Sequence, residues 1–182
     1  MTVADTAAAP QMTTQHDPSG ALAHWLAAMA RSGNTGAICD LQRPHQPSEA
    51  LALAGRFATD EKDRPAFEFT ATLFAQYHAA LPWRDSIRHY GSGDMGAALR
   101  RVGSGALRGP SDPGCDRLFK QLVGPGALPW RHLQHAIARL RSADRFPPSW
   151  SQLARDLSTW SSPDREVQHR WARSFWAPRR SR

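Results

Sequence analysis

Apolar side chains recur at intervals of three and four residues along most of this chain, and this period limits its fold more than any other feature. In the clearest stretch, residues 66–81, Phe67, Leu73, Phe74 and Tyr77 fall on one face of a helix. Alternation of apolar and polar residues, which marks a half-buried strand, never extends beyond a few residues. The pattern predicts an all-α fold, a bundle of about seven to nine helices in two small helical lobes.

Capping and turn residues divide this pattern into elements. The expected helices are 20–31, 36–41, one capped by Ser48, 66–81, one capped by Asp94, 115–123, 129–142, one opened by the capping box of Ser149 and Gln152, and a last one with Ser162 as its cap and Pro163 at its first position. Residues 84–93 and the glycine-rich segment 103–114 are expected to be loops, the second of them mobile. We expect a disordered tail over 1–19, an N-terminal lobe over 20–90, a C-terminal lobe over 91–177 and a frayed basic tail over 178–182.

The charge of the chain is unevenly distributed. It holds 23 Lys and Arg against 16 Asp and Glu, which gives a net charge of +7 and a pI near 10.6. Residues 1–83 contain 5 basic and 8 acidic residues, whereas residues 84–182 contain 18 basic and 8 acidic ones. A GC-rich genome explains the preference for arginine over lysine, but it does not explain this asymmetry. A strongly basic half predicts a polyanionic partner.

The two cysteines and the absence of targeting segments favour a cytoplasmic protein. Cys39 and Cys115 have no neighbouring cysteine in a CxxC pair, and we expect both to be small buried side chains in a reducing compartment. No apolar run is long enough to cross a membrane, and the N-terminal residues lack the basic and apolar regions of a signal peptide.

Catalytic motifs are missing from the sequence. It contains no GxSxG, P-loop, HExxH or paired-carboxylate pattern. His132 and His135 are spaced as two metal ligands on one helix, but no third ligand lies nearby in the sequence, and histidines on a basic helix more often face solvent or phosphate. We therefore expect no enzymatic activity, no metal and no cofactor.

The tryptophans have two possible roles, as core residues or as platforms that stack on unpaired bases. Trp150, Trp160 and Trp171 share helical spacing with leucines and valine, which predicts that they are core residues. The surroundings of Trp83, Trp130 and Trp176 in the sequence constrain them less, and we expect these three to be partly exposed.

Arginines occupy the polar sides of four successive expected helices. The sets are Arg100 and Arg101; Arg117 and Lys120; Arg131, Arg139 and Arg141; and Arg165 and Arg170. One exposed arginine is usually just a solvated residue, but polar sides of this composition predict a continuous basic strip where the helices pack together. Such a strip binds backbone phosphates and does not read sequence.

Several motifs, in order, resemble those of one known family. They are GAICDLQRP (36–44), FTATLFAQYH (69–78), GDMGAALRRV (93–102), DRLFKQLV (116–123), WRHLQHAIARLRSA (130–143), WSQLARDLSTW (150–160) and VQHRWARSFW (167–176). Together they resemble the CasB family, the small subunit of the type I-E CRISPR Cascade complex, over about residues 20–177. In the first motif the family has two adjacent arginines, and here Gln42 replaces the first of them, leaving Arg43.

This resemblance implies a non-catalytic, all-α subunit. Family members lie as two copies, head to tail, against the backbone and large subunits of Cascade, beside the CRISPR RNA and the target strand. Their basic surface stabilises the R-loop and guides the displaced non-target strand, while base pairing recognises sequence. By position in the motifs, the resemblance implies phosphate contacts first at Arg43, Arg64, Arg117, Lys120 and Arg139, and then at Arg100, Arg101, Arg131 and Arg165.

Three other functions are open to a basic helical chain. A helix-turn-helix regulator of duplex DNA needs a recognition helix after a short turn that contains glycine, with Gln134 and Arg139 as the nearest candidates for base contacts. A helical scaffold would present its basic face to an acidic protein. A metal-dependent helical nuclease would require carboxylates that the motifs do not provide.

Overall fold

The computed structural model describes residues 17–43, 46–79 and 86–177. Within these residues the fold is mostly helical, with ten α-helices, two short 3-10 helices and one two-stranded hairpin. The predicted all-α class is confirmed apart from this hairpin, which is formed by β1 (Gly103–Ser104) and β2 (Leu107–Arg108). Tails 1–16 and 178–182, and Trp83, lie outside the described residues.

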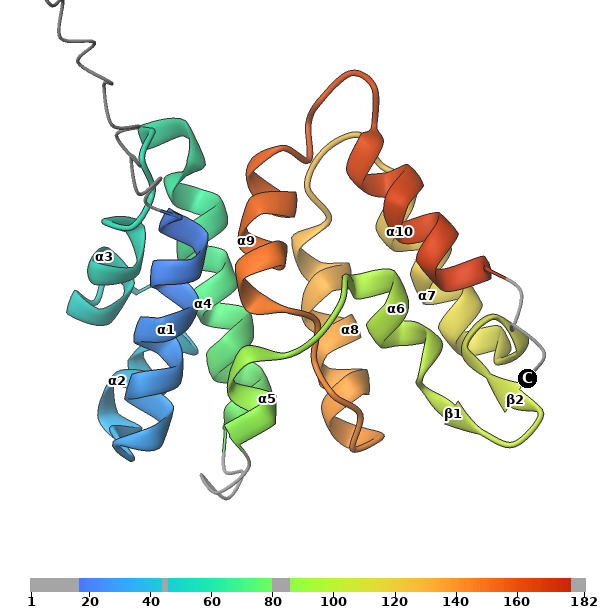
Figure 1. The fold of residues 1–182 in the computed structure, drawn as a ribbon, viewed down its shortest axis with the longest axis horizontal. Coiled ribbons are helices and arrows are strands. Elements are labelled where there is room, and N and C mark those ends of the chain that lie inside the picture. The colour runs from blue at the N-terminus through green and yellow to red at the C-terminus, as the bar shows by residue number, and fades with distance from the viewer. Residues whose placement is uncertain (1–16, 44–45, 80–85, 178–182) are drawn as a thin grey trace, which may run out of the picture.

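Five helices of the N-terminal half gather at one end of the molecule (Figure 1): α1 (Pro18–Arg31), α2 (Thr35–Leu41), α3 (Glu49–Gly55), α4 (Arg64–His78) and α5 (Ser86–Tyr90). A 3-10 helix, η1 (Glu61–Asp63), leads into α4. The short helix predicted at 36–41 and the helix capped by Ser48 are both present. The prediction of a loop over 84–93 is wrong at Ser86–Tyr90, where five residues form one helical turn that packs on α1.

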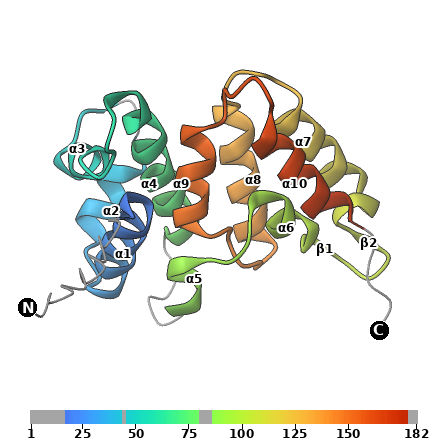
Figure 2. The same cartoon turned by 45° about the horizontal axis from the view of Figure 1, so that its top comes forward.

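The C-terminal half contributes α6 (Met95–Arg100), η2 (Gly109–Ser111), α7 (Pro113–Val123), α8 (Trp130–Ser142), α9 (Trp150–Ser158) and α10 (Glu166–Trp176). In both views α8 and α9 lie between the N-terminal helices and the group formed by α6, α7 and α10 (Figure 2). Helix α9 packs on α1 and α4, and α8 packs on α4, so the two halves share one apolar core.

Capping side chains begin most of these helices where the sequence predicts them. Ser48, Asp94 and Ser149 each accept a hydrogen bond from a backbone N–H in the first turn of the helix that follows. The prediction for the last helix is wrong: Ser162 does not cap it, and α10 begins only at Glu166. The preceding residue, Arg165, takes a left-handed conformation with φ of 53°, which separates the turn around Pro163 from the helix.

Three tryptophans form the centre of the C-terminal core, as predicted. Trp150, Trp160 and Trp171 are fully buried. Their indole N–H groups donate to the Arg88 carbonyl, the Ala127 carbonyl and the Asp156 carboxylate, respectively. Each ring therefore fills core volume without leaving its one polar atom unsatisfied.

The cysteines differ from each other in burial. Cys115 is buried, its thiol donates to the Leu99 carbonyl, and burial raises its pKa to about 11. Cys39 is exposed on α2, so the expectation that both are buried is wrong for this residue. The seven-residue helix α2 buries only Ile38 and Leu41, which leaves Cys39 on its outer face.

Buried His78 is expected to make the fold sensitive to acid. The side chain is 3% exposed, its ring stacks on Phe74, and its Nδ1 lies 3.0 Å from the Phe74 carbonyl oxygen. Burial lowers the pKa of His78 to about 4 from an ordinary value near 6.5; the hydrogen bond to the Phe74 carbonyl opposes this shift, and the nearby His89 adds to it. Because the unfolded chain then binds the proton more readily, the free energy of unfolding falls as the pH drops through this interval, by at most about 3 kcal/mol.

Denaturant unfolding at about pH 7 and about pH 4.5 measures this loss for the protein and for His78→Phe, which keeps a ring against Phe74. The variant is expected to lose clearly less stability between the two pH values. An equal loss in both proteins would place the acid sensitivity elsewhere.

Candidate nucleic-acid interface

Many arginines of the C-terminal half bind backbone carbonyls within the chain. Arg141 donates to the carbonyls of Gln76 and Ala79 at the end of α4. Arg165 donates to those of Val123 and Gly124 at the end of α7. The last carbonyls of a helix lack intrahelical donors and carry partial negative charge. These two predicted surface cations therefore tie distant helix ends together.

Three more arginines act in the same way around α6. Arg100 lies 3.5 Å from the Phe175 carbonyl near the end of α10, and Arg101 donates to the carbonyls of Ser92 and Phe146. Arg145 donates to the Gly103 carbonyl at 3.0 Å. All three guanidinium groups thus connect segments that are far apart in the sequence.

Other predicted cations form ion pairs. Arg64 binds both Glu61 and Glu68, and the Lys120 ammonium lies 2.6 Å from Asp116. These pairs lie on the surface, so each adds little to stability and leaves its cation accessible. The hydrogen bond from Lys120 is the main cause that lowers the pKa of Asp116.

Arg139 has a more structural position. Its guanidinium lies 2.9 Å from Asp112, the residue that caps α7. The backbone N–H of Cys115 and the charge of Arg139 both lower the pKa of Asp112. Arg139 therefore attaches α8 to the start of α7, with part of the guanidinium still open to solvent.

A third group of arginines is exposed and has no hydrogen-bond or ion-pair partner within the described residues. Three of them are predicted site residues: Arg43 after α2, Arg117 on α7 and Arg131 on α8. Two that the prediction omitted, Arg155 on α9 and Arg173 on α10, share this state. Their helical positions, opposite the buried tryptophans, were a signal for them. One such arginine thus projects from each of α7, α8, α9 and α10.

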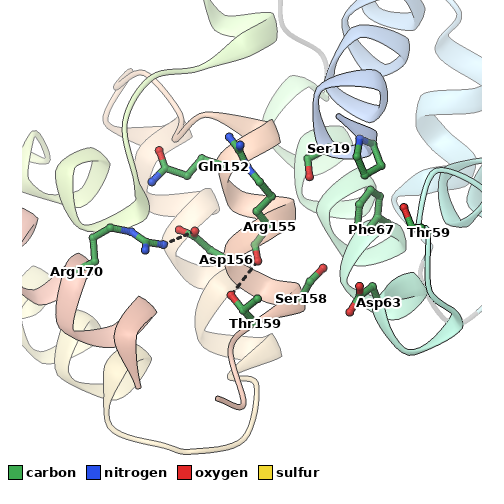
Figure 3. A pocket seen from close by; sticks show the side chains of 11 residues that line it. Ser19, Thr59, Asp63, Phe67, Gln152, Arg155, Asp156, Ser158, Thr159 and Arg170 are labelled. Carbon is green, nitrogen blue, oxygen red and sulfur yellow. Dashed lines mark hydrogen bonds and ion pairs between the residues drawn. The ribbon is translucent and has the colours of Figure 1, made fainter. Parts of the chain in front are cut away.

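Arg155 also lines a pocket of about 710 Å³ between the two halves of the chain (Figure 3). The walls come from the start of α1, from η1 and α4, and from α9 and α10. Polar residues such as Gln152 and Ser158 line it together with Pro18 and Phe67.

An ion pair between α9 and α10 forms one wall of this pocket. Asp156 is 3% exposed, accepts a hydrogen bond from Trp171 at 2.6 Å, and pairs with Arg170 (Figure 3). Burial raises the pKa of Asp156, and the hydrogen bond from Trp171 and the charge of Arg170 oppose this rise. Arg170, which the sequence placed on the basic strip, is thus held against a carboxylate.

The predicted site residues do not all gather in one place. Arg117 and Lys120 lie one turn apart on α7, and Arg100 and Arg101 line one pocket. Arg43 and Arg64 belong to the N-terminal half, while Arg131 and Arg139 lie on α8 and Arg165 lies directly before α10. A continuous basic strip through all of them stays a prediction.

The described residues offer little for metal chemistry. The rings of His132 and His135 lie 6.5 Å apart, and no cluster of three or more His, Cys, Asp or Glu in 17–43, 46–79 and 86–177 is placed to hold a metal ion. Over the same ranges, every helix is too short or too polar to span a lipid bilayer.

Comparison with known proteins gives two matches. The model of the family described as CRISPR-associated protein Cse2 matches residues 38–176. The crystal structure of CasB from Thermobifida fusca is similar in fold, with a TM-score of 0.71 and 20% sequence identity over 89% of this chain and 99% of that chain. No curated protein sequence matches. Because the family model covers most of the chain, the protein belongs to the Cse2 family, also called CasB, the CRISPR-associated small subunit of type I-E Cascade.

Proposed function

We propose that this chain is a non-catalytic subunit that binds nucleic-acid backbone and stabilises the R-loop, both at the CRISPR RNA–target duplex and at the displaced non-target strand. Its partners in this role are the backbone and large subunits of Cascade and a second copy of itself, head to tail, in the cytoplasm. Family membership supports a place in Cascade, and the arginines support contact with phosphate.

The observation that carries this proposal is the set of free guanidinium groups on successive helices. Arg117, Arg131, Arg155 and Arg173 are exposed and unpaired within the described residues, and we refer to them as the free arginines. A guanidinium without a carboxylate partner is available for bidentate hydrogen bonds to phosphate oxygens. Contacts of this kind are indifferent to sequence, which suits a subunit beside strands of every sequence.

The helix-turn-helix alternative fits the helices less well. Within the described residues, a three-residue turn that contains glycine joins α1 to α2, but α2 (Thr35–Leu41) has no basic residue and carries Asp40. The candidates for base contacts lie beyond the start of α8, Gln134 in its middle and Arg139 in its last turn, and the connection 124–129 before this helix is longer than such a turn. A recognition helix is thus missing where the motif needs one.

Reconstitution tests the proposed function. A Cascade complex assembled from the other subunits and a CRISPR RNA, with and without this chain, is bound to a matching DNA duplex, and the lifetime of the R-loop is measured. The lifetime is expected to be shorter without the chain and to recover when the chain is added, for targets of unrelated sequence alike. Equal lifetimes with and without the chain would contradict the proposal, and recovery on one target sequence alone would favour a sequence-specific regulator.

A further inference from the structure

The β1–β2 hairpin brings a third arginine beside Arg100 and Arg101. Gly109, at the end of the hairpin, has a positive φ of 54° and lies directly against the Arg100 carbonyl, where any Cβ would overlap it. Its N–H donates to the Val102 carbonyl at 2.8 Å, and Arg108 pairs with Gly103 across the hairpin. These backbone contacts hold Arg108 close to the last turn of α6.

The three arginines line one pocket of about 540 Å³, together with Ala106, Pro110 and Ser111. We refer to it as the arginine pocket. Its lining contains three guanidinium groups, one hydroxyl and no carboxylate. The pocket between the two halves of the chain is different, because Asp63 and Asp156 line it together with its two arginines.

Within the described residues, no carboxylate forms an ion pair with an arginine of this pocket, and the hydrogen-bond acceptors of Arg101 and Arg108 are neutral groups. Arg101 donates to the Ser92 hydroxyl and to two carbonyls, its Nε–H is buried without an acceptor, and burial lowers its pKa. Arg108 donates from its Nε to the Arg101 carbonyl at 3.4 Å. A partly buried guanidinium without an anion is unfavourable, and an anion in the pocket would remove that cost.

The carboxylate that interacts electrostatically with Arg101, that of Asp94, already has other partners. Asp94 caps α6 through the N–H of Ala97 and accepts a hydrogen bond from Ser174 at 2.7 Å. It is 6% exposed and does not line the pocket. The pocket therefore presents a concentrated positive charge to whatever enters it from solvent.

We propose that the arginine pocket holds one phosphate group of a nucleic-acid backbone, with Arg100 and Arg108 as its main ligands and Ser111 as an additional donor. Two arginines that line one small cavity can together offer the bidentate hydrogen bonds that the tetrahedral oxygens of a phosphate accept. Arg101 contributes positive charge and supports the wall of the pocket, because its Nη groups already donate to Ser92 and Phe146. This inference rests on the proposed function and adds to it a defined anchoring point and a ligand, Arg108, outside the predicted site residues.

The test uses the full chain and follows the Nε–H signals of its arginines by NMR, first with inorganic phosphate and then with a short oligothymidylate, at constant low ionic strength. Both probes are expected to shift the signal of Arg108, and the oligothymidylate is expected to compete with phosphate. The melting temperature should rise by about 3 °C on adding phosphate relative to chloride. Arg108→Gln should lose most of this rise. Arg56→Gln should keep it, because Arg56 is an exposed arginine of the N-terminal half that does not line the pocket.

Two outcomes would overturn the inference. If phosphate shifts Arg108 but the oligothymidylate does not, the pocket binds small anions and not a backbone. If phosphate raises the melting temperature of Arg108→Gln and of Arg56→Gln by the same amount, phosphate does not bind in the arginine pocket through Arg108. The proposed function is tested separately, by the lifetime of the R-loop in two complexes, one that contains the Arg108→Gln chain and one that lacks the chain.

Discussion

Replacement of Asp156 with alanine is expected to lower the free energy of unfolding by about 3–5 kcal/mol and the melting temperature by about 10 °C. Asp156 is buried between α9 and α10, where it accepts from Trp171 and pairs with Arg170. Its removal leaves a buried indole N–H and a largely enclosed guanidinium without their acceptor. Loss of one partner of a buried ion pair costs more than the pair itself contributes.

Two further variants make this prediction specific. Asp156→Asn keeps an oxygen acceptor for Trp171 and is expected to cost clearly less than alanine. Asp164→Ala, at an exposed position just before α10 with no partner in the described residues, is expected to change stability by less than about 0.5 kcal/mol. Denaturant unfolding of the three variants measures the differences, and an Asp156→Ala protein as stable as the Asp164→Ala protein would show that the ion pair does not hold the two helices.

Charge reversal of the free arginines is expected to weaken binding of single-stranded DNA by the assembled complex about a thousandfold at low salt. The variant carries glutamate at Arg117, Arg131, Arg155 and Arg173. Each substitution removes a charge-assisted hydrogen bond to phosphate and adds repulsion. Because all four side chains are exposed and unpaired, the free energy of unfolding of this variant should differ from the wild-type value by less than about 1 kcal/mol.

Arg56→Glu is the matched control, since it is an exposed arginine of the acidic N-terminal half with no partner in the described residues. Binding of a labelled strand by fluorescence anisotropy, with thermal unfolding of each variant in parallel, measures both effects. Strand binding that is as weak in Arg56→Glu as in the fourfold variant would indicate a general effect of net charge. A collapse of thermal stability in the fourfold variant would show that these arginines are structural.

The sequence was sufficient for most of the helices and for the tryptophans of the core. Trp150, Trp160 and Trp171 repeat with leucines and valine at helical spacing, and this local period alone identifies them as buried. Capping by Ser48, Asp94 and Ser149 is equally local, because a capping side chain and the backbone N–H that donates to it lie within one turn. Features set by neighbours in the sequence were thus predictable.

The roles of the arginines were not predictable in this way. Arg165 binds carbonyls near residue 123, and Arg141 binds those near residue 76, so the partner of each is known only once the helices have packed. Arg108 was missed because the glycines around it read as a loop, although the positive φ of Gly103 and Gly109 permits the hairpin. Helical periodicity shows which side chains point away from the core, but not which of them donate a hydrogen bond to a backbone carbonyl.

The most direct test of phosphate binding by this subunit is the slope of log affinity against log salt for a Cascade complex bound to its target, between about 50 and 200 mM salt. The test compares complexes that contain the wild-type chain with complexes in which the four free arginines are replaced by glutamine. Each phosphate contact contributes about 0.7 to the slope for a single strand, so the glutamine variant should give a slope shallower by about 3. Identical slopes for the two complexes would mean that the free arginines touch no phosphate, and would contradict the proposed function.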